Sequence, residues 1–240
     1  MTDTAPLRWD IIPQGDRCIL LVLSDQIDVA VGRRCAAAAA ALRLAAIPGI
    51  DDIVPTLNSV ALHYQPRLLG ADTLFQHLVG KIEKVLDASL NAKQAPSVGR
   101  QITIPVCYGG EFGPDLAEVA AHCQLSPADV IRLHSHEPAY VFMLGFAPGA
   151  PYIGVHDKQL AIGRRATPRT SLPAGSVAIA NRQTMIYPNA SPGGWHVIGA
   201  TPSILFDPEK NPSTLLAAGD TVRFVPIDPQ EYLALKREAA

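Results

Sequence analysis

Several features are scarce or missing in this 240-residue chain. It has no excess of basic residues, since 20 Lys and Arg stand against 22 Asp and Glu and the formal net charge is -2. The chain therefore lacks the positive charge that nucleic acids and anionic membrane surfaces usually select. It has four cysteines and no CxxC pair, which predicts reduced thiols and a cytoplasmic protein. These cysteines are Cys18, Cys35, Cys107 and Cys123.

The chain also lacks a membrane-length apolar run. Its most apolar stretch, CAAAAAALRLAAI at 35–47, is interrupted by Arg43 and is shorter than the roughly 20 residues that a membrane span needs. The first ten residues, MTDTAPLRWD, show no basic segment followed by an apolar core. We therefore expect a soluble helix at 35–47 and no secretory signal.

Standard catalytic motifs are missing as well. The sequence has no GxxxxGK[ST] phosphate loop, no GxGxxG after a strand, no HExxH and no GxSxG. HSHE at 134–137 has a His-x-His spacing, and His156 could add a third metal ligand. Because His134 should end a helix, that geometry is disfavoured, and we expect a helix-terminal histidine and no metal.

The first part of the chain alternates strands and helices. LRWDII and RCILLVL have the composition of strands, and a helix is expected to begin at Asp28 or an earlier polar residue and to stop at Pro48-Gly49. NSVALHYQ follows as a half-buried strand, and a second helix should run from a cap at Asp72 to about Leu90. We predict a small α+β domain over 1–92, with the Pro- and Gly-containing segment 93–99 as a linker.

The second part changes character after two short helices. Ser126 and Asp129 resemble a capping box, which predicts a helix ending at about His134. From Tyr140 onward, short apolar runs are broken by Gly and Pro, and we expect no further helix. This pattern is typical of a closed or nearly closed β-barrel, which we place at 100–240.

Three rigid segments of this second part combine Gly and Pro with polar and aromatic side chains. They are LGFAPGAPYIG (144–154), RRATPRTSLPAGS (164–176) and NRQTMIYPNASPGGW (181–195). Taken singly, each is best explained as an ordered barrel loop, with Tyr187 and Trp195 filling the core. Taken together, they favour a ligand site, because binding residues concentrate on loops held by a scaffold. Gly193 and Gly194 permit backbone angles that other residues resist, and Pro192 fixes one dihedral just before them.

Several long motifs in fixed order carry a family resemblance. They are YGGEFGPDL, LGFAPGAPYIG, PRTSLPAGSVAIANRQTMIYPNASPGGW, IGATPSILFDP and AGDTVRFVPI, with GDRCILLVLSDQID and IVPTLNSVALHYQP nearer the N-terminus. The chain resembles the family of the 5-oxoprolinase B subunit, also known as allophanate hydrolase subunit 1 and as the Kip inhibitor of a sporulation histidine kinase. This resemblance implies a small α+β N-terminal domain followed by a cyclophilin-like β-barrel C-terminal domain.

The resemblance also implies an activity. The B subunit would act with a sister carboxyltransferase-type C subunit and a LamB/YcsF-type A subunit to open 5-oxo-L-proline to L-glutamate with ATP hydrolysis. We hypothesise that ATP phosphorylates the lactam oxygen, so that water can attack the ring carbon. Since the chain has no phosphate loop, the ATP site would be unconventional, shared with the partner or carried by it.

Carried over position by position, the family pattern implies a set of site residues. His134 would serve as acid or base, Gln183 would bind an amide and Arg169 would bind an anion. The Gly193 and Gly194 amides could face an oxyanion. The residues expected to bind substrate are Phe146, Pro148, Gly149, Tyr152, Tyr187, Ser191, Gly193, Gly194 and Trp195.

The chain departs from the family pattern at four positions. Ala150, Asn181, Met185 and Ala200 stand where the family usually has Phe, Gly, Gly and Arg. Met in place of a loop glycine would close space, and the missing Arg removes a charge. Three other functions stay open: an allophanate hydrolase or urea carboxylase component, a binding module that inhibits a histidine kinase, and, last, a prolyl isomerase suggested by fold alone.

Overall fold

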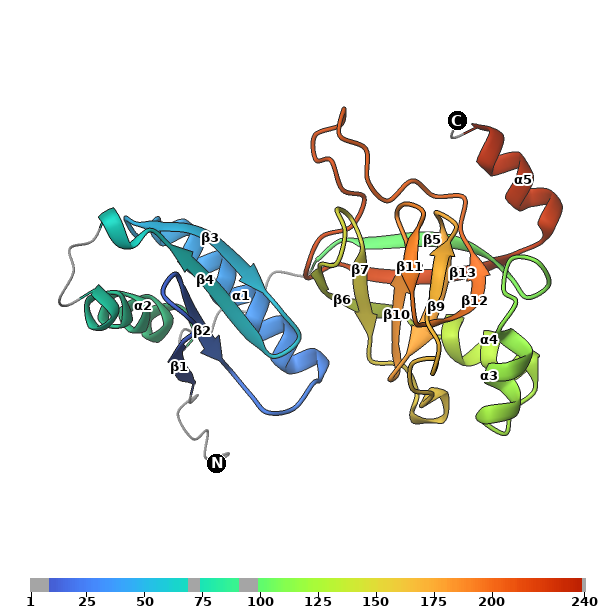
Figure 1. Cartoon of the computed structure of the whole chain (residues 1–240), viewed down its shortest axis with the longest axis horizontal. Coiled ribbons are helices and arrows are strands. Elements are labelled where there is room, and N and C mark those ends of the chain that lie inside the picture. The colour runs from blue at the N-terminus through green and yellow to red at the C-terminus, as the bar shows by residue number, and fades with distance from the viewer. Residues whose placement is uncertain (1–8, 69–73, 91–98, 239–240) are drawn as a thin grey trace. The chain divides into compact units, whose positions relative to one another are not determined.

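The structure, a computed structural model, describes residues 9–68, 74–90 and 99–238. The chain divides into two compact units, Met1–Val98 and Gly99–Ala240, which are treated separately below (Figure 1). The predicted cap Asp72 and residues 93–98 of the predicted linker lie outside the described residues.

The first unit contains a four-stranded antiparallel sheet and two helices. The sheet order is β1-β2-β4-β3, with β1 Asp10–Pro13, β2 Cys18–Val22, β3 Ile50–Pro55 and β4 Ser59–Tyr64. The helices are α1 Val29–Ala45 and α2 Leu74–Leu90, with a short 3-10 helix η1 at Pro66–Leu68. Buried side chains of both helices and of the sheet form one core.

Helix α1 begins and ends where local chemistry dictates. The Asp28 side chain accepts a hydrogen bond from the Val31 amide at 2.9 Å, which confirms the predicted start. Ala46, at φ 44°, ends the helix in the left-handed region. Ala38 and Ala39 are fully buried, so the alanine run serves as a close-packing face.

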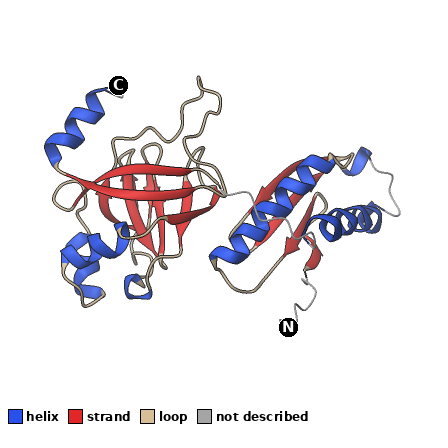
Figure 2. Ribbon diagram, turned by 180° about the vertical axis from the view of Figure 1, so that it is seen from behind, coloured by secondary structure: helices blue, strands red, loops and turns tan. Residues whose placement is uncertain are grey.

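The second unit is built on a closed barrel of seven strands, which confirms the predicted architecture (Figure 2). The order around the barrel is β10-β7-β6-β13-β5-β12-β9. The bounds are β5 Gln101–Tyr108, β6 Ala139–Leu144, β7 Pro151–Gly154, β9 Ser176–Ala180, β10 Gln183–Ile186, β12 His196–Ala200 and β13 Thr221–Ile227. β5 and β13 pair in parallel, and the other pairs are antiparallel. β8 Arg169–Leu172 and β11 Ser191–Gly193 form a separate two-stranded sheet.

Two short helices follow β5. They are α3 Leu116–His122 and α4 Pro127–Ser135, and a 3-10 helix η2 follows at Lys158–Leu160. The Ser126 hydroxyl accepts a hydrogen bond from the Asp129 amide at 3.1 Å, so the predicted cap of α4 is confirmed.

The expectation of no helix after Tyr140 was wrong. α5 spans Pro229–Glu238 and lies apart from α3 and α4 (Figure 1). The Asp228 side chain accepts hydrogen bonds from the amides of Gln230 and Glu231 at 2.8 and 2.9 Å, and Pro229 occupies the first helical position. These start signals stand in the sequence directly after a barrel strand.

The cysteines and the helices both bear on the sequence predictions about the environment of the chain. All four cysteines are free thiols. Across 9–68, 74–90 and 99–238, no helix combines the length and the apolar character that crossing a membrane requires.

Candidate functional site

The rigid segments of the second unit meet on the outer wall of the barrel. Successive strand residues point to opposite faces, so in β10 Ile186 belongs to the core inside the barrel and Met185 to a second cluster outside it. This wall cluster consists of Leu172, Ala178, Ala180, Met185, Tyr187, Trp195 and Val197, with Tyr152 packed against it. Each of the three rigid segments contributes to this cluster, but residues 144–150 of the first segment do not.

Aromatic rings extend the wall cluster toward solvent. Tyr152 meets Trp195 edge to face at 6.0 Å between ring centroids, and Phe146 meets Tyr187 in the same way at 6.1 Å. The Arg164 guanidinium lies 5.9 Å from the centre of the Trp195 ring. Phe146 is 60% exposed and has φ 75°, a conformation that bulky side chains rarely adopt. Strained backbone of this kind is common at functional sites, and the predicted role of Phe146 in binding stays a prediction.

The structure brings Gln183 and Trp195 to the same wall. Gln183 pairs with Ala180 in β9, and the preceding residue of β9, Ile179, pairs with His196 of β12. Trp195 therefore lies opposite Ala180, two strands away from Gln183, at a backbone distance of roughly 10 Å. Gln183, Tyr187 and Trp195 are only 9%, 1% and 4% exposed. Tyr187 and Trp195 therefore fill a buried cluster, as expected if each segment is an ordered barrel loop.

Two adjacent glycines lie in the 191–195 segment. Neither Gly193 nor Gly194 has a positive φ, so the segment does not use the backbone angles that glycine permits. Gly193 is required for close packing instead, because a Cβ there would lie 2.3 Å from the Tyr187 hydroxyl oxygen. The Gly194 carbonyl accepts a hydrogen bond from the Arg165 amide at 2.7 Å.

The buried carboxylate Asp115 binds two arginines next to the wall cluster. It receives two hydrogen bonds from Arg169, at 2.7 and 2.6 Å, and one from Arg165 at 3.1 Å. The Val197 amide donates a further bond at 2.7 Å. Burial works to raise the pKa of Asp115, but the bonds from Arg169 and Val197 outweigh it, so the pKa lies below its usual value. Arg165 also pairs with Glu118 at 3.0 Å.

Asp115 was absent from the predicted site residues. The sequence carried a signal for it, because Asp115 ends the motif EFGPD between a strand and a helix. The pairing changes the expectation for Arg169, whose guanidinium is engaged in a two-point bond with a carboxylate. Its role in binding an external anion stays a prediction.

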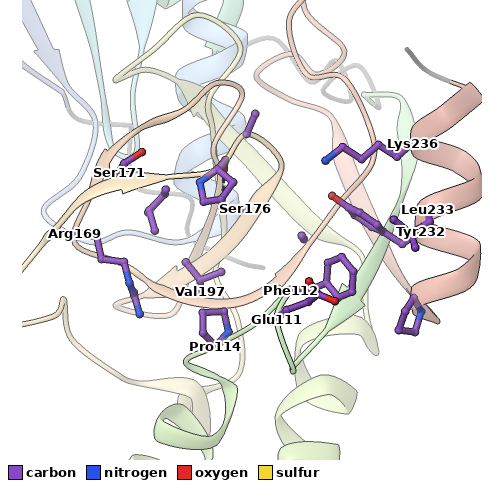
Figure 3. A pocket seen from close by; sticks show the side chains of 15 residues that line it. Glu111, Phe112, Pro114, Arg169, Ser171, Ser176, Val197, Tyr232, Leu233 and Lys236 are labelled. Atoms are coloured by element: carbon purple, nitrogen blue, oxygen red, sulfur yellow. Dashed lines mark hydrogen bonds between the residues drawn. The ribbon is translucent and has the colours of Figure 1, made fainter.

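A pocket of about 530 Å³ adjoins this network, a size typical of small-molecule sites (Figure 3). Figure 3 shows Arg169 and Ser171 on one side, with Tyr232 and Lys236 of α5 on the other. Leu172 belongs both to the pocket lining and to the wall cluster. Among the predicted site residues, Arg169 alone lines this pocket, together with the departure position Ala200.

His134 lies inside the barrel rather than at a surface. It is fully buried, and its Nδ1 and Nε2 atoms lie 2.7 Å from the Tyr108 hydroxyl and 2.9 Å from the Thr184 hydroxyl. His156 Nε2 lies 2.6 Å from the same Thr184 hydroxyl. Burial, with a smaller contribution from Arg182, lowers the pKa of His156 to about 4. Both histidines are therefore neutral near pH 7, and the role of His134 as acid or base stays a prediction.

The other predicted site residues divide by exposure. Phe146 and Pro148 are exposed, while Tyr152, Ser191, Gly193 and Gly194 are half-buried and Gly149 is buried. At the C-terminal end of α4, the exposed side chains of His136 and Glu137 approach each other to 3.8 Å. In the described ranges, no group of three His, Cys, Asp or Glu residues could hold a metal ion.

Met185 does not sit in a loop, as the family comparison had led us to expect. It lies in β10, pairs with Tyr152 of β7 and is 2% exposed. Ala150 is fully buried as well. Asn181, at φ 51°, occupies a left-handed turn position that asparagine tolerates better than most residues.

The closed seven-stranded barrel places the second unit among the β-barrel folds. The chain is similar in structure to the Kluyveromyces lactis urea carboxylase, with a TM-score of 0.77 over 99% of this chain and 24% of that chain. The sequence identity is 17%, so this likeness concerns the fold alone. Residues 9–216 match the sequence model described as "Carboxyltransferase domain, subdomain C and D", and the chain belongs to this family, that of the 5-oxoprolinase B subunit.

Two further relatives show how far the similarity extends. The chain is 41% identical to the B subunit of 5-oxoprolinase from Bacillus subtilis (strain 168), covering 97% of this chain and 99% of that protein. It is also similar to the crystal structure of TTHA0988, with a TM-score of 0.75 and 34% identity over 88% of this chain. The match covers 40% of the TTHA0988 chain. The family membership predicted from the sequence motifs is thus confirmed.

Proposed function

We propose that this chain is the B subunit of an ATP-dependent 5-oxoprolinase that hydrolyses 5-oxo-L-proline to L-glutamate in the cytoplasm. It acts with a carboxyltransferase-type C subunit and a LamB/YcsF-type A subunit. The observation that carries this proposal is the 41% identity with the Bacillus subtilis protein over almost the full length of both chains. The proposal includes a small α+β domain over 1–92, a linker over 93–99 and a cyclophilin-like barrel domain over 100–240.

The described residues of this chain do not by themselves fit a nucleoside triphosphate. Arg165 and Arg169 are both paired with Asp115, and Arg164 lies against the ring of Trp195. The sequence also lacks a phosphate-binding loop. We therefore place ATP on the partner chains and assign no step of its chemistry to residues of this chain.

The substrate-facing part of this chain is the surface around Phe146. The Phe146 ring contacts the buried Tyr187, and in the same cluster the half-buried Tyr152 contacts the buried Trp195, so these rings form a rigid aromatic group. Rigid aromatic residues with partly exposed edges are typical anchors of protein and ligand contacts. A partner protein that covers this surface would complete the site.

Two of the departures from the family pattern are compatible with the family's substrate class. Ala150 and Met185 are 0% and 2% exposed, so they change interior packing rather than a surface that a substrate touches. Asn181 lies in a turn. Ala200 lines the 530 Å³ pocket instead.

Co-expression tests the proposal. The purified complex of this chain with its two partner proteins should release ADP only when 5-oxo-L-proline is present, and this chain alone should release none. Formation of L-glutamate in step with ADP is the second readout. A correctly assembled complex without 5-oxoproline-dependent ADP release would refute the assignment.

No observation favours a second function to the same degree. The likeness to urea carboxylase concerns the fold, at 17% identity. Inhibition of a histidine kinase and prolyl isomerisation have no structural feature that singles them out.

A further inference from the structure

Helix α5 presents one face to the 530 Å³ pocket. The α5 residues in the pocket lining are Pro229, Tyr232, Leu233 and Lys236. Their spacings of three and four residues place them on the same side of the helix. Leu233 is nonetheless 52% exposed, so this face borders a hollow instead of packing against a core.

α5 is anchored near its first turns. The Tyr232 ring, 4% exposed, packs against Phe112 with 4.6 Å between ring centroids. Asp228 caps the first turn, and in 229–238 no other side chain is buried. Leu233 and Lys236 therefore extend beyond the anchor, along the pocket rather than into the barrel (Figure 3).

The charged side chains of the lining restrict the kind of ligand that this pocket can bind. Lys236 Nζ lies 5.6 Å from the centre of the Tyr232 ring, and it has no carboxylate partner among the described residues. Arg169, the other cation of the lining, is held by Asp115. The pocket thus offers one uncommitted ammonium group beside the aromatic pair Phe112 and Tyr232.

Glu111 sets an upper limit on the negative charge of a ligand. It lines the same pocket, is exposed and makes no ion pair within the part of the chain that the structure describes. A second negative charge on a ligand would be repelled by this carboxylate. One cation and one anion around an aromatic wall favour a ligand with a single negative charge.

We propose that the α5 pocket binds a small monocarboxylate with a flat apolar body. The carboxylate meets Lys236, the apolar body lies against Phe112 and the exposed Leu233, and Glu111 discriminates against dianions. α5 lies outside the 9–216 range of the family match, and the proposal does not depend on the 5-oxoprolinase assignment.

Titration of the isolated full-length chain by two-dimensional amide NMR tests this proposal, with benzoate as the probe and its neutral analogue benzamide as the comparison. Benzoate should shift the amide signals of the non-proline residues in 111–114, 171–176 and 229–238, and benzamide should bind at least threefold more weakly. Lys236→Gln should weaken benzoate about three- to fivefold, the range of an exposed ion pair. Arg237→Gln, one residue further along the same exposed turn, is the matched control and should leave the affinity unchanged.

Inorganic phosphate tests the charge limit. It should bind more weakly than benzoate to the natural chain, and Glu111→Gln should narrow that difference. Equal affinity for benzoate and benzamide, equal effects of the Lys236 and Arg237 substitutions, or no shift in the α5 region at millimolar benzoate would each overturn the proposal. 5-Oxoprolinase activity of the assembled complex is a separate measurement, so the two proposals can fail independently.

Discussion

Gly193 is the position of the 191–195 segment where a side chain cannot be accommodated. A Cβ there would lie 2.3 Å from the Tyr187 hydroxyl oxygen and 2.7 Å from Leu172 Cδ1. Gly193→Ala should therefore destabilise the second unit by about 1–3 kcal/mol, the cost of overpacking a buried site. Urea unfolding followed by Trp fluorescence measures this change.

The neighbouring glycine provides the matched control. At Gly194, a Cβ would lie 3.5 Å from Pro168 Cγ, an ordinary contact. Gly194→Ala should stay within about 0.5 kcal/mol of the natural chain. Equal effects of the two substitutions would contradict the packing role assigned to Gly193.

Phe146, unlike Gly193, should matter for partner binding rather than for stability. Its φ of 75° suits glycine better than phenylalanine, so Phe146→Gly should change the free energy of unfolding by less than about 1 kcal/mol. If the surface around Phe146 is the partner contact, the same change should weaken binding to the partner protein at least tenfold, as for a hot-spot aromatic. Calorimetry on the separately purified proteins measures the loss, with Leu44→Ala, 88% exposed on α1, as the neutral control. Unchanged binding would remove Phe146 from the contact.

At the scale of elements, α4 places a polar side chain, His134, inside the barrel. It carries His134 to the Thr184 hydroxyl of β10, which His156 also contacts, with 4.8 Å between the two imidazole centroids. A hydroxyl has one hydrogen, so it can donate to only one of the two imidazoles. Neutral imidazoles satisfy this arrangement, whereas a charge would be buried without a carboxylate partner.

The stability of the second unit should therefore fall in mild acid. The pKa of His156 is lowered to about 4, that of His134 lies well below its usual value, and an unfolded histidine titrates near about 6.5. The unfolded state then binds more protons, so the contribution is complete above pH 6.5 and is lost as the pH falls toward 4. For His156 alone the loss reaches about 3 kcal/mol. Urea unfolding at pH 7.5, 5.5 and 4.5 measures it.

His156→Gln separates this effect from other acid sensitivities. The variant should show a shallower dependence of stability on pH between 6.5 and 4, because one titrating group is gone. Asp115, whose pKa is depressed, contributes its own loss only as the pH falls below the ordinary carboxylate range. An unchanged slope in the variant would show that His156 is not buried as a neutral group.

Asp115 joins three elements by charge. It precedes α3, accepts the Val197 amide of β12 and holds Arg169 of β8. Asp115→Asn should cost about 3 kcal/mol, since it leaves the partly buried guanidinium of Arg169 without its counter-charge. Glu118→Gln, at a side chain 56% exposed, should cost less than about 1 kcal/mol by the same urea measurement. Similar costs for both would show that the network is only a surface feature.

The elements themselves followed closely from local sequence signals. Asp28 and Ser126 act as the caps that their side chains predicted, and strand alternation and Gly–Pro punctuation located the barrel. α5 was missed because a strand-like run ends immediately before its Asp–Pro start. Local propensity thus predicted the elements wherever a single signal dominated.

The site was less predictable, because its residues meet only through the tertiary structure. Nothing near Arg169 in sequence indicates that Asp115, 54 positions earlier, would occupy its guanidinium. Nor does the helical position of His134 reveal that its ring enters the barrel. Burial and pairing are properties of the closed barrel, and they decide which of the predicted polar residues remain free for a ligand.

At the scale of the whole molecule, each compact unit has its own hydrophobic core. The first unit has one buried cluster drawn from its sheet and helices, and the second has the barrel core and the clusters packed around it. The start of the barrel is fixed internally, because the Arg100 guanidinium bonds Asp220 at 2.6 Å and β5 pairs with β13 along its length. These contacts meet the requirement for a domain that folds by itself.

A fragment covering 99–240 should therefore fold without the first unit. Its amide NMR spectrum should overlay that of the same residues in the full chain, apart from residues near the new N-terminus. It should also keep the acid sensitivity of the histidine pair and the benzoate response of the α5 pocket, because His134, His156 and Lys236 all lie within it. A fragment with native helix content but no dispersed side-chain signals would show that the barrel core depends on residues before Gly99, since cores without specific packing lose such dispersion first.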